Sequence, residues 1–186
     1  ATRKVVRPGF IDIHTHSDLT LVVEGRAPSS VAQGITTQIA GNCGVSAAPT
    51  RDHEPYYGPL DPAMTRGLVC DWTGFDEYFA RLEDQGVGTN VATLVGHGNL
   101  RVAALGWDDR EATPSELSRM RDLTAQAMEH GAVGLSSGLA YAPGPYAPLE
   151  ELVALGEVVG RFAGIYTSHI RNQTKGIADA VGEVIA

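Results

Sequence analysis

The chain has 186 residues, of which 43% are hydrophobic and 19% are charged, and its formal net charge is −8. This composition is typical of a globular protein with one domain, and the acidic balance argues against nucleic acid or an anionic membrane as a partner. No apolar stretch approaches the roughly 20 residues that span a bilayer. With two cysteines and no visible signal peptide, we expect a cytoplasmic protein without a disulfide framework. Because the chain starts at Ala1 and runs directly into a strand, we also expect it to be part of a longer protein.

Apolar, β-branched runs alternate with helical patterns along the chain. Strands are predicted at 9–14, 35–40, 90–96, 132–137 and 164–169. Helices are predicted near 26–33, 74–85, 114–130, 148–162 and 175–186. Repeated strand-then-helix units predict an α/β fold with parallel strands, either a doubly wound sheet or a (β/α)8 TIM barrel. A complete barrel takes about 250 residues and eight units. About five βα units are recognisable here, so a barrel would be incomplete and open.

Polar side chains gather where the predicted strands end. These residues are His14, His16, Asn42, Cys43, His97, Tyr141, His169 and Arg171. The carboxyl ends of parallel strands meet at one edge, and β/α folds place their ligand sites there. The segment 44–73, rich in Pro and Gly, follows the second strand and is expected to form a lid or a substrate wall over the same edge.

Candidate ligands from three predicted strand ends in this set indicate a metal site. In a strand, His14 and His16 would leave the same face together with Asp12, and imidazole is a common metal ligand. Cys43 lies in a Gly-Asn-Cys-Gly segment whose backbone can turn sharply, and His169 ends the fifth strand. Each has an alternative role: a solvent-facing strand, a buried small apolar side chain, and a hydrogen-bonding cap. Together, one thiolate and several imidazoles predict zinc.

Several segments resemble one enzyme family. Residues 8–18 are similar to the strand-one signature of the amidohydrolase superfamily. Residues 41–46, 96–101, 134–141 and 168–171 resemble the N-acyl-D-amino-acid deacylases, also called D-aminoacylases. The resemblance covers nearly the whole chain. It implies an incomplete TIM barrel over 1–186 and zinc-dependent hydrolysis of the amide bond of small-molecule N-acyl-D-amino acids by the parent enzyme.

The resemblance also assigns roles to the metal-ligating residues. His14 and His16 match the paired histidines of a more weakly held metal, Cys43 matches the thiolate that holds or bridges metal, and His169 matches an imidazole of the tight site. One zinc is thus expected to be tightly held, with room for a second, weaker site. The family's further histidine ligand and its catalytic aspartate belong to later strands. Neither these strands nor the flanking β-domain is recognisable in this sequence. We therefore expect the 186-residue chain alone to be inactive.

Three residues match substrate contacts. Tyr141 matches a tyrosine that reaches the substrate near the scissile amide. Arg171 is a candidate for binding the substrate carboxylate, with a salt bridge at the rim as an equal alternative. His97 is a weaker candidate for substrate contact, because a hydrogen bond in the core explains it as well.

Other functions remain open. Residues 134–138 fit G-x-S-x-G, the nucleophile elbow of serine hydrolases, although Pro143 prevents a helix from following directly. A dihydroorotase or hydantoinase acting on cyclic amides typically uses a modified lysine, but Lys4 and Lys175 end no strand. A non-catalytic partial domain could instead form a homodimer through the exposed edges of an open barrel.

Overall fold

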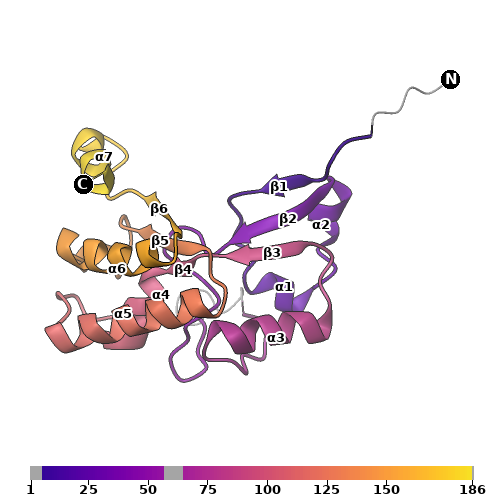
Figure 1. Cartoon of the computed structure of the whole chain (residues 1–186), viewed down its shortest axis with the longest axis horizontal. Helices are drawn as coiled ribbons and strands as arrows, with labels where there is room; N and C mark the ends of the chain where they lie inside the picture. Colours follow the sequence, from indigo (N-terminus) through magenta and orange to yellow (C-terminus); the bar gives the residue numbers. More distant parts are fainter. Residues whose placement is uncertain (1–5, 57–64, 186) are drawn as a thin grey trace.

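The computed structural model describes residues 6–56 and 65–185. It contains six strands, all paired in parallel. β1 (Phe10–Asp12), β2 (Ile35–Ala40) and β3 (Asn90–Thr93) form one sheet in that order. β4 (Val95–Gly96), β5 (Gly134–Gly138) and β6 (Ile165–His169) form the second. The predicted α/β class with parallel strands is confirmed, and the described strands do not close into a barrel (Figure 1).

The two sheets continue into each other. The predicted strand over 90–96 is interrupted only at Leu94, which separates β3 from β4. The Leu94 amide donates to the carbonyl of Ala40, the last residue of β2. The amide of Val133, just before β5, donates to the Thr93 carbonyl at the end of β3. The strands therefore form one curved row whose carboxyl ends share an edge, with β1 and β6 at its two ends (Figure 1).

The five predicted helices are present, and the structure adds two more. The structure contains α1 (Thr20–Val23), α2 (Pro28–Ala32), α3 (Phe75–Gln85), α4 (His97–Leu105), α5 (Pro114–Glu129), α6 (Leu149–Arg161) and α7 (Ile177–Ile185), and a short 3-10 helix at Gly144–Tyr146. The two helices that were not predicted are α1, which has only four residues, and α4, whose start lacks a polar cap and carries a glycine. The α5 start has the expected capping box, in which Thr113 and Glu116 exchange hydrogen bonds.

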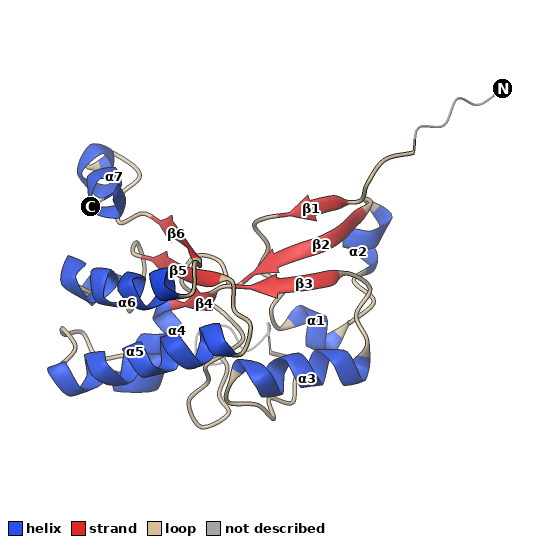
Figure 2. Ribbon diagram, viewed as in Figure 1, coloured by secondary structure: helices blue, strands red, loops and turns tan. Residues whose placement is uncertain are grey.

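The core lies between the strands and the helices along one side of them (Figure 2). Trp72, Leu100 and Met120 are among its fully buried side chains. The helix α5 packs between α4 and α6, and α3 contacts α1. No helix in the described part of the chain is both long enough and apolar enough to traverse a bilayer.

The β1 end of the row is poorly covered. Phe10 and Ile11 are 46% and 62% exposed, although both are large and apolar. Ile13, just after the strand, is also exposed. This end of the sheet thus presents unpaired strand edge and apolar surface together, a combination that favours pairing with further chain.

Candidate metal centre

Three of the predicted metal ligands come together at the carboxyl edge of the strands. The ligating atoms of His14, His16 and Cys43 all lie within 4.8 Å of one another. The Cys43 Sγ atom lies 3.3 Å from His14 Nε2, and the two imidazole rings meet edge-on with centroids 5.5 Å apart. Among the residues that the structure describes, this is the group of His, Cys and acidic side chains close enough to share one ion.

The histidines reach this position from a loop. β1 ends at Asp12, so the predicted strand over 9–14 is too long, and alternation along a strand does not explain why His14 and His16 converge. The Asp12 Oδ1 atom accepts a hydrogen bond of 3.1 Å from the His14 amide. The Thr15 amide, which lies between the two histidines, donates to the Ile39 carbonyl of β2. The Asp12 side chain therefore holds the start of this loop by accepting a hydrogen bond from the His14 backbone.

His169 lies on the same cavity, farther from the three-residue cluster. The cavity has a volume of about 490 Å³. Its walls are formed by His16, Cys43, Val45, Tyr56, Tyr141, Ala142 and His169. Five separate segments of the chain thus bring imidazole, thiol and phenol groups onto one opening at the strand ends.

The surroundings of His16 and Cys43 shift their pKa values in ways that matter for metal binding. Burial lowers the pKa of His16, and the neighbouring His14 and His169 lower it further, so the neutral ligating form is favoured. Burial raises the pKa of the Cys43 thiol, against a smaller opposing effect from Tyr141. A cation that binds here must displace the thiol proton, so binding releases a proton. One sulfur and imidazole nitrogens are the donors that zinc prefers.

Tyr141 borders the cluster. Its hydroxyl donates to the Cys43 carbonyl oxygen, and its ring meets His169 edge-on at 5.4 Å. Tyr56 and Val45, which were not singled out from the sequence, also line the cavity. Both belong to the segment predicted to form a substrate wall, although residues 57–64 of that segment lie outside the described residues.

The other two candidate substrate residues have partners inside the protein. The Arg171 Nη2 and Nε atoms donate to the Glu183 carboxylate of α7 at 2.6 to 3.2 Å, which is the ion-pair alternative left open by the sequence. His97 is fully buried and its Nε2 lies 2.7 Å from Glu151 Oε1. His97 thus forms the core hydrogen bond rather than lining the cavity.

The G-x-S-x-G serine has a structural position. Ser136 is fully buried in β5, and its hydroxyl donates to Gly41 and accepts from the Gly44 amide. No helix follows β5 directly; the next helical segment starts at Gly144. A nucleophile elbow requires an exposed serine on a strand-to-helix turn, so this geometry argues against a serine hydrolase.

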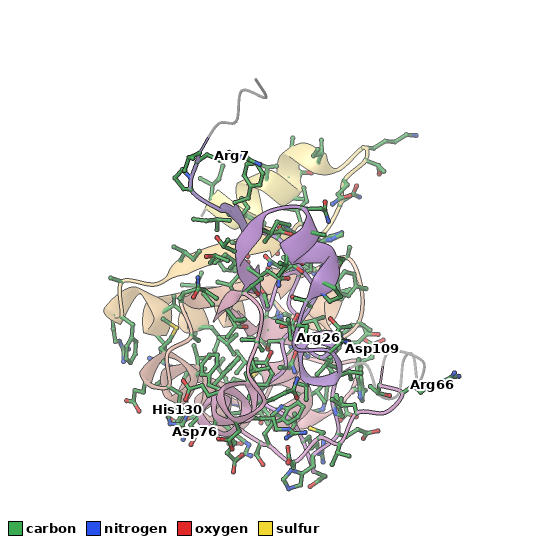
Figure 3. The ribbon with its side chains drawn as sticks, turned by 90° about the vertical axis from the view of Figure 1, so that its right-hand side faces the viewer. Arg7, Arg26, Arg66, Asp76, Asp109 and His130 are labelled. Atoms are coloured by element: carbon green, nitrogen blue, oxygen red, sulfur yellow. The ribbon has the colours of Figure 1, made fainter. Side chains whose placement is uncertain are left out.

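A larger cavity lies away from this edge. Its volume is about 820 Å³, and it is lined by Asp76, His130 and Asn90, the first residue of β3. The His130 Nδ1 atom lies 3.2 Å from Asp76 Oδ1 there (Figure 3). The cavity thus lies at the amino end of a strand, where β/α proteins do not usually carry their chemistry.

Comparison with known proteins shows the family to which the chain belongs. The sequence model of the amidohydrolase family matches residues 1–166. The chain belongs to the amidohydrolase family. Within it, the chain is 41% identical to the N-acyl-D-glutamate deacylase of Alcaligenes xylosoxydans xylosoxydans over 98% of its length, and 37% identical to the D-aminoacylase of the same organism over 96%. The resemblance to N-acyl-D-amino-acid deacylases is thereby confirmed.

Solved amidohydrolase structures share the fold. The N-acyl-D-glutamate deacylase of Bordetella bronchiseptica, solved with zinc and a phosphonate inhibitor, superposes with a TM-score of 0.85 at 44% identity over 96% of this chain. A D-aminoacylase structure gives a TM-score of 0.86 at 34% identity over 95%. The chain spans 37% of the length of each of these proteins and of the two curated relatives.

Proposed function

We propose that this chain is the metal-binding part of a zinc-dependent N-acyl-D-amino-acid deacylase. The observation that carries the proposal is the 3.3 Å approach of the Cys43 sulfur to His14, within a cluster that includes His16. A thiolate among imidazoles distinguishes this site from that of amidohydrolases built around a modified lysine. The relatives named above support the substrate class, because they are deacylases of N-acyl-D-glutamate and other N-acyl-D-amino acids.

The proposed ligands are His14, His16, Cys43 and His169. When bound, zinc supplies Lewis-acid activation of the amide carbonyl and of the attacking water. The favoured neutral state of His16 leaves a nitrogen lone pair free for the metal. The first three ligands already share one space, whereas His169 faces the same cavity from β6 and would hold the tight ion with Cys43. A second, weaker ion would then rest on His14 and His16.

Tyr141 is the proposed contact to the substrate amide. Its ring borders the cavity, and its hydroxyl donates to the Cys43 carbonyl. To donate to the oxygen that gains charge during hydrolysis, this hydroxyl would have to turn from the Cys43 carbonyl toward the substrate. Arg171 can bind a substrate carboxylate only if this carboxylate replaces that of Glu183. The cavity itself, at about 490 Å³, has the size of a small-molecule site.

We further propose that residues 1–186 form the first five βα units of a TIM barrel whose closing strands and flanking β-domain lie elsewhere in the parent protein. The uncovered apolar side chains of β1 and the relative lengths of the deacylases support this. The 186-residue chain alone is then expected to bind zinc and to hydrolyse negligible substrate. In isolation, its uncovered β1 edge is expected to pair with a second copy, which sedimentation velocity would detect.

The function is tested by transplanting residues 1–186 into the corresponding part of the Alcaligenes N-acyl-D-glutamate deacylase. The zinc-loaded chimera should hydrolyse N-acetyl-D-glutamate or N-acetyl-D-alanine, leave the L-enantiomers intact, and lose activity with Cys43→Ala. Activity that persists in Cys43→Ala would contradict the proposal. Turnover of dihydroorotate or hydantoin without turnover of N-acyl-D-amino acids would instead favour the cyclic amidohydrolases.

A further inference from the structure

The cysteine lies in an unusual turn. The Asn42 carbonyl accepts from the Val45 amide at 3.1 Å, which closes a four-residue turn with Cys43 and Gly44 at its centre. Both central residues have positive φ, +55° and +76°, as in a type I′ turn. Cysteine rarely adopts this left-handed conformation, so the surrounding structure must hold it there.

A single buried hydroxyl spans this turn. The Ser136 Oγ atom accepts from the Gly44 amide at 2.9 Å and donates to the Gly41 carbonyl. The Gly44 amide belongs to the peptide in the middle of the turn, and the hydrogen bond from Val45 to Asn42 that closes the turn does not involve it. Gly41 also has positive φ, and its amide donates to Asp18 Oδ1 at 2.8 Å. The segment before and after Cys43 is thus tied on one side to β5 and on the other to the loop that carries His16.

We propose that Ser136 is a positioning residue for the metal site: its hydroxyl fixes the turn that holds the Cys43 thiol against His14. This inference rests on the proposed metal-binding function. Gly41, Gly44 and Ser136 are all buried, so removing the hydroxyl leaves a carbonyl and an amide without a partner in a region closed to water. The turn must then rearrange to satisfy these groups, and Cys43 moves with it.

The neighbouring serine provides a matched control. Ser137 is as fully buried as Ser136 and lies on the same strand. Its hydroxyl bonds instead to Tyr166 Oη at 2.7 Å and to Ser168 Oγ at 2.9 Å, on β6. Ser136→Ala and Ser137→Ala therefore remove the same group from the same strand, but only the first removes a contact to the cysteine turn.

The test measures metal binding by the 186-residue chain. Cobalt(II) is titrated into the wild type, Ser136→Ala and Ser137→Ala, with the thiolate-to-cobalt absorption band as the readout for Cys43, and zinc affinity is measured by competition with a chelator. We expect Ser136→Ala to weaken zinc binding about 10- to 100-fold and to diminish the band. Ser137→Ala should keep both the zinc affinity and the absorption band of the wild type, because the Ser137 hydroxyl does not contact the cysteine turn.

Unchanged affinity and band in Ser136→Ala, or equal losses in Ser137→Ala, would overturn the inference. If Ser136→Ala does not fold, Ser136→Cys takes its place, since the longer C–S bond should push the turn apart and still lower zinc affinity, and unchanged affinity would again contradict the assignment. A wild type whose cobalt spectrum does not differ from that of Cys43→Ala would refute the proposed metal site itself. A band that depends on Cys43 but not on Ser136 would refute only the positioning role.

Discussion

Replacing Glu151 with Gln should destabilise the protein strongly, because this carboxylate is the centre of a buried charge cluster. Glu151 lies in the first turn of α6 and is 2% exposed, while His97 and Arg101 of α4 are both fully buried. The Arg101 Nη1 atom donates to both Glu151 oxygens at 2.7 and 2.8 Å, and His97 Nε2 lies 2.7 Å from one of them. The cluster thus links two helices that follow different strands.

The magnitude follows from what the Glu151→Gln substitution would leave behind. A glutamine has no charge to balance the Arg101 guanidinium, and removing one member of a buried ion pair typically costs about 3–5 kcal/mol. For a chain of this length, about 1 kcal/mol corresponds to a shift of about 2–4 °C in the melting temperature. We therefore expect Glu151→Gln to lower the melting temperature by about 6–20 °C.

Glu150→Gln is the matched control. Glu150 is the preceding residue in the same first turn, but its side chain is exposed. Both substitutions remove one negative charge near the α6 amino terminus, so the difference between them isolates the buried cluster. Thermal unfolding followed by circular dichroism measures both. Equal shifts, or a shift below about 2 °C for Glu151→Gln, would refute the argument that the buried charges stabilise each other.

The same cluster predicts a pH dependence. Burial tends to raise the pKa of Glu151, but the hydrogen bond and charge of His97, followed by Arg101, outweigh it and lower the pKa below its usual value. A carboxyl whose pKa is lower in the folded state contributes stability above its unfolded pKa, near 4.5. That contribution is lost as the pH falls through the folded pKa. Urea denaturation at decreasing pH should show this acid loss in the wild type and a shallower one in Glu151→Gln.

Three further substitutions test the site and its support. Cys43→Ala should lower zinc affinity by about 100-fold or more in chelator competition, because a ligand is lost rather than a supporting group, whereas Cys70→Ala should leave the affinity unchanged. Burial raises the pKa of Asp18 to about 7, so the folded state resists its ionisation and stability should fall by about 4 kcal/mol as the pH rises from 4 to 8. In urea denaturation, Asp18→Asn should lack this decline; an equal decline in the variant would show that other groups cause it. A Cβ at Gly138 would collide with the Cys43 carbonyl, so Gly138→Ala should weaken zinc binding and stability, while Gly156→Ala, with nothing within 4 Å of the new Cβ, should not.

Much of the fold could be predicted because the parallel strands have short apolar patterns with clear ends. The strand over 35–40 was predicted with the bounds observed for β2. The helix over 114–130 was predicted to within a residue of α5, since its capping box and proline mark the start chemically. These signals are local: they depend on neighbouring residues along the chain and not on the tertiary structure.

The missed helix α4 and the overextended first strand have a common cause. The helix α4 begins with His97-Gly98-Asn99, which has no helical signature, and its start is held by distant groups: the Gly98 amide donates to the Gly44 carbonyl, and Asn99 bonds to the backbone of Ser46. In β1, the apolar alternation continues beyond Asp12, but pairing with β2 ends there. Tertiary contacts decide both boundaries.

The composition of the cluster of His14, His16 and Cys43 could be predicted from the sequence, but its geometry could not. Paired histidines, a cysteine flanked by glycines and a histidine at a strand end indicate zinc from their chemistry alone. The position of the thiol depends instead on Ser136, which is 92 residues away from Gly44 along the chain. In the sequence this serine completes a G-x-S-x-G pattern and suggests a nucleophile. Only the fold shows that its hydroxyl already has two backbone partners, and a hydroxyl that donates to a buried carbonyl is poorly placed to attack a substrate. The same residue that suggests a second catalytic chemistry thus supports the first.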